Sequence, residues 1–209
     1  MKLVSETFVD MGAIPARCAF AEPDFPKHVR LSANRNPQIA WVGLPSGTHS
    51  LALICHDPDV PSRADEVNKE GRTIPASLPR VDFFHWVLID LRPFDGPILE
   101  AEFSREVMQR GKPGPQASRG ARQGLNDFTG WFAGDQAMTG DYFGYDGPYP
   151  PWNDPVVHRY IFTLYALNVR ECPVAGRFTG PEVLAAIEGR ILDSAVITGR
   201  YSLNLAATI

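Results

Sequence analysis

The chain has 209 residues, and its net charge of −4 comes from 20 basic and 24 acidic side chains scattered along its length. No stripe of Lys and Arg is present to neutralise a phosphate backbone, which argues against nucleic acid as a partner, and no apolar run is long enough to span a bilayer. The 19 prolines and 18 glycines predict many turns and disfavour a helix bundle.

The amino terminus lacks the apolar core of a secretion signal, because acidic Glu6 and Asp10 interrupt it. The three cysteines are odd in number and have no close metal-type spacing, which fits a reducing compartment. We therefore expect a cytoplasmic protein.

Four stretches are predicted to form the strands of a sheet. Residues 39–42 and 50–55 are apolar and flank a Pro-Ser-Gly-Thr turn, which predicts a hairpin. Residues 83–91 and 158–169 are apolar on both faces, so both are expected to be central strands. In the first of them, alternation places Phe83, His85, Val87 and Ile89 on one face.

Two long segments, residues 62–80 and 111–154, lack hydrophobic periodicity, and loops of such length are usually functional. Thr179 and Glu182 form a capping box that predicts a short helix to about Ile187, ended by Gly189. A last strand follows at residues 195–203. With no internal repeat, residues 1–209 are predicted to form one all-β domain, a sandwich with a few short peripheral helices.

The segment HDPDVP places two carboxylates, Asp57 and Asp59, directly after a buried strand. Pro58 and Pro61 restrict the backbone around them, so the carboxylates point where the chain directs them. Because closely spaced prolines in sharp turns favour the isomer, we expect a cis peptide bond at one of these two prolines.

Two histidines complete the polar set. His85 lies in a strand that is otherwise made of large apolar residues, and His158 and Tyr160 share one face of the next long strand by its period of two. A stiff Gly- and Pro-rich loop precedes that strand, and its Gly147 is expected to let backbone N–H groups approach an anion.

The segments HDPDVPS, FFHWVLIDL, GPYPPWNDPVVHRYIFTLYAL and GRYSL, taken in order, resemble the phosphatidylethanolamine-binding protein family in its bacterial branch. The resemblance implies a β-sandwich of two antiparallel sheets with a preformed pocket for phosphate, acetate or a phospholipid head group, and no cofactor. The pocket residues that it implies are Asp57, Asp59, Pro61, His85, Gly147, Pro148, Pro150, Pro151, His158 and Tyr160.

This chain departs from the animal members in its longer segments 62–80 and 104–142, and Phe84 and Trp86 flank His85 where those members carry paired histidines. Kinase regulation, a property that the resemblance attaches to animal members, is therefore not carried over.

The leading function is that of a binding protein for a small anion or phosphorylated ligand, without enzymatic activity. The alternatives are a hydrolase using Asp57, His85, His158 and Ser62, a metal site built from the histidines and aspartates, and a protease or kinase inhibitor that acts through its loops. Aromatic side chains on the long loops favour the last of these, or a homodimer, if they are exposed; they are Trp131, Phe132, Tyr142, Phe143, Tyr145, Tyr149 and Trp152.

A carboxylate in an anion site needs a reason, because it repels the ligand. Asp57 must either orient a histidine or accept a proton that the ligand carries. Phosphate carries such a proton near neutral pH and sulfate does not, so the sequence predicts a preference for phosphate.

Overall fold

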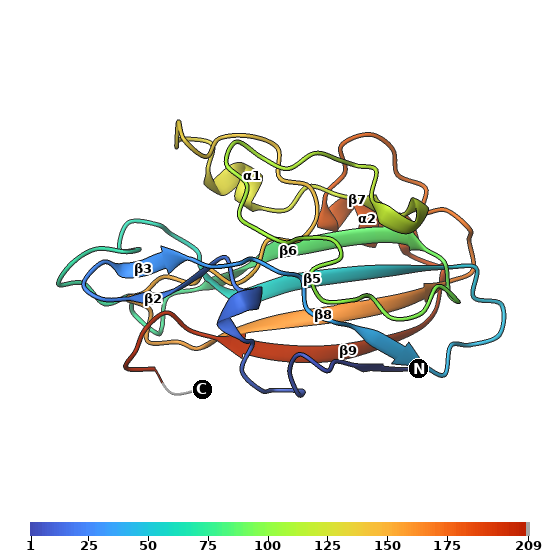
Figure 1. The fold of residues 1–209 in the computed structure, drawn as a ribbon, viewed down its shortest axis with the longest axis horizontal. Coiled ribbons are helices and arrows are strands. Elements are labelled where there is room, and N and C mark those ends of the chain that lie inside the picture. Colours follow the sequence, from blue (N-terminus) through green and yellow to red (C-terminus); the bar gives the residue numbers. More distant parts are fainter. Residues whose placement is uncertain (208–209) are drawn as a thin grey trace.

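The computed structural model describes residues 1–207 and is built on a five-stranded antiparallel sheet (Figure 1). Across this sheet the strands are β7 (Arg122–Gln123), β6 (Arg80–Leu91), β5 (Ser50–Pro61), β8 (His158–Leu167) and β9 (Ile191–Tyr201). Two smaller antiparallel pairs join β1 (Lys2–Val4) to β4 (Ala40–Val42) and β2 (Ala21–Asp24) to β3 (His28–Leu31). The predicted all-β fold is confirmed.

Both faces of the large sheet are covered, because its three central strands, β6, β5 and β8, are apolar on both sides. On one face, Leu53, Trp86 and Phe162 pack against amino-terminal residues such as Phe8 and Ile14. Burying each large apolar side chain of this kind contributes roughly 1.5–3 kcal/mol. The other face packs against the helix α2 (Gly180–Ile187).

The helices are short and lie at the periphery. They are η1 (Ala16–Cys18), η2 (Ser118–Gly120), α1 (Phe128–Trp131) and α2. The predicted capping box is present, since the backbone N–H of Thr179 donates to Glu182 at 2.8 Å, and Gly189 follows with φ of 72°. Among residues 1–207, none of the helices has the length and apolarity that a bilayer crossing requires.

The predicted hairpin between residues 39–42 and 50–55 is wrong. The turn itself forms, with the Thr48 hydroxyl donating to the Pro45 carbonyl at 2.7 Å. However, β4 pairs with β1, and β5 has β6 and β8 as neighbours on its two edges. Turn residues specify where the chain bends, but longer and more apolar partners decide which strands pair.

The expected cis bond at Pro58 or Pro61 is also wrong: the cis X-Pro bonds in the described residues precede Pro26 and Pro115. The reason is that β5 does not end at Cys55 but continues through both prolines. Pairing with β8 ends at His56, and the pairing with β6 shifts register between Asp57 and Val60. A strand tolerates a trans proline at an edge that has no partner strand, or at a bulge.

Candidate functional site: a pocket at one end of the large sheet

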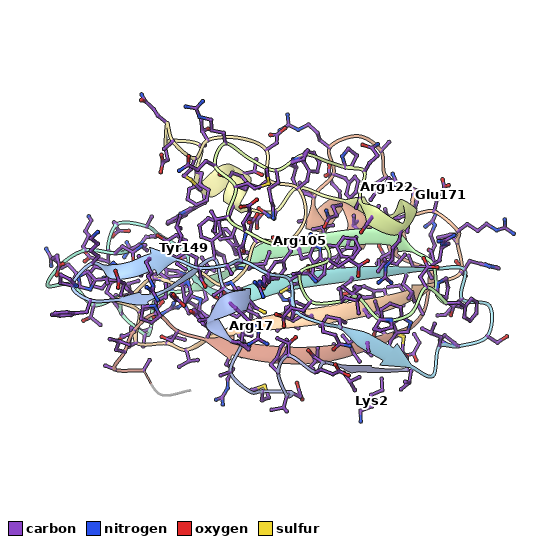
Figure 2. All side chains as sticks on the ribbon, viewed as in Figure 1. Lys2, Arg17, Arg105, Arg122, Tyr149 and Glu171 are labelled. Atoms are coloured by element: carbon purple, nitrogen blue, oxygen red, sulfur yellow. The ribbon has the colours of Figure 1, made fainter. Side chains whose placement is uncertain are left out.

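The antiparallel pairing of the three central strands, β6, β5 and β8, brings the predicted polar residues together. Asp57 lies in the second half of β5, whereas His85, His158 and Tyr160 lie in the first halves of β6 and β8. Because β6 and β8 both run opposite to β5, these positions meet at one end of the sheet. Figure 2 shows Tyr149, which lines the pocket described below, at this same end, next to β2 and β3.

A β-bulge turns His85 toward this group. Trp86 pairs with Cys55 and Phe84 pairs with the next residue, His56, so His85 has no partner in the register. The expected alternation therefore fails, because Phe84 packs in the same cluster as Val87, on the α2 face. A bulge inserts one residue and re-aims a side chain, here leaving the His85 ring 5.1 Å from the ring of Tyr160.

Four charged side chains form a chain of hydrogen bonds beneath the pocket. His158 Nδ1 lies 2.6 Å from Asp57 Oδ2, and His158 Nε2 lies 3.2 Å from Asp154 Oδ2. Arg80 donates to both oxygens of Asp154, at 2.5 and 3.2 Å. With His158 protonated, two positive and two negative groups balance, so the Asp57 carboxylate is compensated.

His158 is held in its charged form by these neighbours. Burial by itself would lower its pKa, but the charge of Asp57 and the hydrogen bonds to Asp154 and Asp57 outweigh burial and raise the pKa to about 9. Asp57 also accepts the backbone N–H of Asp59 at 2.8 Å. The histidine-orienting role that the sequence allowed for Asp57 is therefore present in the structure.

His85 is in the opposite state. Its Nδ1 donates to the backbone carbonyl of Asp146 at 2.7 Å, since a carbonyl oxygen can only accept. Burial lowers the pKa of His85 more than the nearby Asp57 and Asp146 raise it. His85 is therefore neutral at neutral pH, with Nε2 as the ring nitrogen that bears no proton.

The backbone that holds His85 is secured by a buried ion pair. The carboxylate of Asp146 lies 3.1 Å from Lys112 Nζ and accepts hydrogen bonds from Asn34 at 2.6 Å and Asn126 at 2.7 Å. The Asp146 backbone N–H also donates to the His85 carbonyl at 3.0 Å. These contacts explain how the loop around Asp146, which has no regular secondary structure, can hold His85 in position.

Tyr160 supplies the one buried hydroxyl without a partner in the described chain. Tyr160 is 1% exposed, and its oxygen makes no hydrogen bond of normal length, although the Asp57 carboxylate lies near enough to interact with it. Burial, the charge of Asp57 and this interaction raise the pKa of Tyr160 well above its usual range, so the hydroxyl keeps its proton. An unpartnered buried hydroxyl costs free energy. A ligand that accepts a hydrogen bond from the hydroxyl recovers it.

Asp57, His85, His158 and Tyr160 form the floor of a cavity of about 400 Å³. Its walls are mostly apolar and aromatic. Phe83 comes from β6 and Tyr149 from the loop that precedes β8, and α1 and its carboxyl end contribute Phe128, Trp131 and Phe132. A large apolar cavity with few convergent polar groups is typical of a small-molecule site.

Most of the predicted site residues line this cavity; they are Asp57, Pro61, His85, Pro150, Pro151, His158 and Tyr160. Asp59 instead forms a two-point ion pair with Arg159, with distances of 2.8 and 2.9 Å. Gly147 and Pro148 are not among the lining residues: the Gly147 N–H donates to Asn34 Oδ1 at 2.8 Å, and the Pro148 carbonyl accepts from Phe20. The Gly147 N–H is therefore already hydrogen-bonded, and its expected role as an anion donor stays a prediction.

Sequence reasoning named several of the wall aromatics but missed Asn153, which holds part of the wall in place. Asn153 holds the loop of residues 62–79 against the pocket by donating to the carbonyls of Glu66 and Arg72 at 2.8 and 3.1 Å. The aromatic residues of α1 belong to a segment without periodicity, so only their density gave a signal.

The structure also bears on the alternative functions. Ser62 is exposed and does not line the cavity, and no other Ser, Thr or Cys of the described residues does. Within residues 1–207, no three His, Cys, Asp or Glu side chains gather as metal ligands would. Of the seven loop aromatics, four are buried, and only Trp131, at 45%, is counted as exposed. A homodimer through these loops stays a prediction.

The fold and the cavity define a β-sandwich protein with a preformed pocket at one end of its large sheet. The family model for phosphatidylethanolamine-binding protein matches residues 4–202, and the chain belongs to this family.

Relatives cover nearly the whole chain. A UPF0098 protein of Methanothermobacter thermautotrophicus is 31% identical over 204 residues, covering 96% of this chain and 98% of the relative. The UPF0098 protein YbhB of Escherichia coli is 28% identical over 202 residues, covering 97% and 100%. The crystal structure of Escherichia coli YbcL, described as a member of the mammalian PEBP family, superposes with a TM-score of 0.67 at 22% identity, covering 96% and 97%, and shows the same fold.

Proposed function

We propose that this protein binds a small anion or phosphorylated ligand, such as phosphate or a phospholipid head group, in the pocket lined by His85 and Tyr160, and that it acts as a ligand-binding or regulatory protein. The observation that carries the proposal is the Tyr160 hydroxyl, which is buried, protonated and without a partner beneath an open cavity. The neutral chain of Asp57, His158, Asp154 and Arg80 supports it, because it removes the repulsion that a lone carboxylate would exert.

The cavity also indicates the shape of the ligand. Its aromatic walls extend beyond the polar floor, so a phosphate group would occupy the floor and an apolar part of the molecule would contact Phe83, Phe128 and Trp131. An aryl phosphate monoester therefore makes a suitable probe.

Calorimetric titration of phenyl phosphate into the wild type and into Tyr160→Phe tests the proposal. Because hydrogen bonds to charged groups are worth roughly 1.5–3 kcal/mol, the variant should bind about 10- to 100-fold more weakly. Tyr165→Phe is the matched control, since Tyr165 lies on the same strand and packs on the opposite, α2 face. An equal loss in both variants, or none in Tyr160→Phe, would contradict the assignment.

A further inference from the structure

The floor of the pocket is short of hydrogen-bond donors. Both ring nitrogens of His158 are held by carboxylates, the Gly147 N–H is held by Asn34, and Nδ1 of His85 is held by the Asp146 carbonyl. Among these buried groups, what remains for a ligand is the Tyr160 hydroxyl and Nε2 of His85, whereas the further donors that line the cavity, the amide of Asn68 and the indole of Trp131, belong to its walls.

The walls do not make up for this shortage with positive charge. None of the described residues that line the cavity is Lys or Arg, whereas two of them, Asp57 and Asp135, carry carboxylates. One hydroxyl is a poor partner for the several oxygens of a phosphate group, because buried polar atoms need hydrogen bonds. The only further donor that the floor could offer is a protonated Nε2 of His85.

The surroundings of His85 decide which protonation state an anion would favour. The charged or titratable groups that face the ring are Asp57 from β5, His158 and Tyr160 from β8, and the loop residue Asp146, whose carboxylate is paired with Lys112. Phe83 and Phe128 supply apolar contact, with ring centroids 5.0 and 5.5 Å away. A neutral ring presents a lone pair that repels an anion, whereas a bound anion in this dry setting favours the charged ring.

We propose that an anion binds in this pocket together with one proton from solvent, which Nε2 of His85 holds in the complex and releases when the ligand leaves. This inference rests on the proposed function. The site then discriminates by pH as well as by ligand shape. The apparent affinity decreases by about tenfold per pH unit above neutrality, because each bound anion requires one proton.

Titration calorimetry of phenyl phosphate at pH about 7.5 in two buffers of different ionisation enthalpy measures this proton directly. At that pH the probe is mostly the dianion, since the second pKa of a phosphate monoester is about 6. The wild type should take up about one proton per bound ligand.

The variant His85→Gln assigns the proton to this ring. The glutamine amide can donate a hydrogen bond without titrating, so binding should persist with a proton uptake near zero and a flattened pH profile. His56→Gln is the matched control: His56 is the adjacent residue on β5 to Asp57, its ring lies 5.9 Å from Phe84 on the α2 face, and it does not line the cavity. Its proton uptake should equal that of the wild type.

The outcomes separate the two proposals. Binding without proton uptake in the wild type overturns the proton linkage alone. An unchanged proton uptake in His85→Gln would mean that the ligand carries the proton, which overturns the role of His85. No binding at any pH between about 5 and 8, the range in which a histidine titrates, overturns the proposed function itself. Should His85→Gln not fold, NMR titration of the wild-type imidazole with and without phenyl phosphate decides, and an unchanged titration midpoint overturns the proposal.

Discussion

At the level of single residues, His85 and His158 lie in one pocket yet are driven to opposite protonation states. His158 contacts two carboxylates, whereas His85 contacts a backbone carbonyl and aromatic rings. The same side chain is therefore a fixed positive charge in one position and a neutral group in the other, because the neighbours differ and burial does not.

The first prediction concerns His158 and stability. Its pKa rises from 6.5 to about 9 on folding, so the stabilisation from its charged form is fully present below pH 6.5 and is lost as the pH rises through 9. By linkage, the free energy of unfolding should fall by roughly 3 kcal/mol across this range. Urea unfolding at a series of pH values measures it.

The matched variant is His158→Gln, in which the pH dependence between 6.5 and 9 should flatten. If that variant does not fold, NMR titration of the wild-type imidazole provides the check, with an expected midpoint near pH 9. A midpoint near 6.5 would show that Asp57 and Asp154 do not hold the charge.

The second prediction concerns Asp57 and the choice between phosphate and sulfate. Both Asp57 oxygens already accept one hydrogen bond, but each can accept another, so the carboxylate can still take a proton carried by phosphate. Phosphate should bind about tenfold or more tightly than sulfate, because a charge-assisted hydrogen bond is worth roughly 1.5–3 kcal/mol.

Asp57→Asn should raise the affinity for sulfate relative to phosphate, since an amide offers a donor and no negative charge. Calorimetric titration of both anions into the wild type and the variant measures the ratio. Equal affinities in the wild type, or an unchanged ratio in the variant, would leave Asp57 with only its role of holding His158.

At the level of elements, the site depends on irregularities in otherwise regular strands. The bulge at His85 aims that ring into the pocket, and the register shift between Asp57 and Val60 lets β5 continue through two prolines. The loop of residues 144–151 closes the arrangement by packing against the segment around Cys18, with the Tyr145 hydroxyl donating to the Cys18 carbonyl at 2.6 Å.

The third prediction tests this close packing at Gly147. A Cβ atom there would overlap the Cys18 carbonyl oxygen, a backbone atom that cannot rotate away. Gly147→Ala should therefore lower the free energy of unfolding by roughly 1–3 kcal/mol, the usual cost of overpacking. Gly130→Ala is the matched control, because its Cβ would meet nothing within 4 Å and lies in a helix that favours alanine. Urea unfolding of both variants gives the comparison, and equal stabilities would show that the loop can shift.

At the level of the whole molecule, the fourth prediction is that the protein does not hydrolyse esters or phosphate monoesters. None of the residues that line the cavity within residues 1–207 is Ser, Thr or Cys, so no such nucleophile faces a bound ligand. Incubation with p-nitrophenyl phosphate and p-nitrophenyl acetate should release no product above background. Turnover that His158→Ala abolishes would favour the hydrolase.

The sequence by itself determined the long strands, the α2 helix with its capping box, and the identity of the polar residues at the pocket. These follow from local signals: apolar runs, the Thr179 and Glu182 spacing, and the DPD-x-P and HRY segments that carry the family resemblance. Each signal lies within about a dozen residues, so chain-local chemistry is enough to specify it.

Only the tertiary structure decided which of these residues are free to meet a ligand. Asp59 is paired with Arg159, the Gly147 N–H with Asn34, and Asp146 with Lys112, across separations of 100, 113 and 34 residues. Whether a donor is available depends on partners that the fold brings from distant parts of the chain. The pattern along the sequence names the polar groups of a pocket, but it does not tell which of their hydrogen bonds are already made.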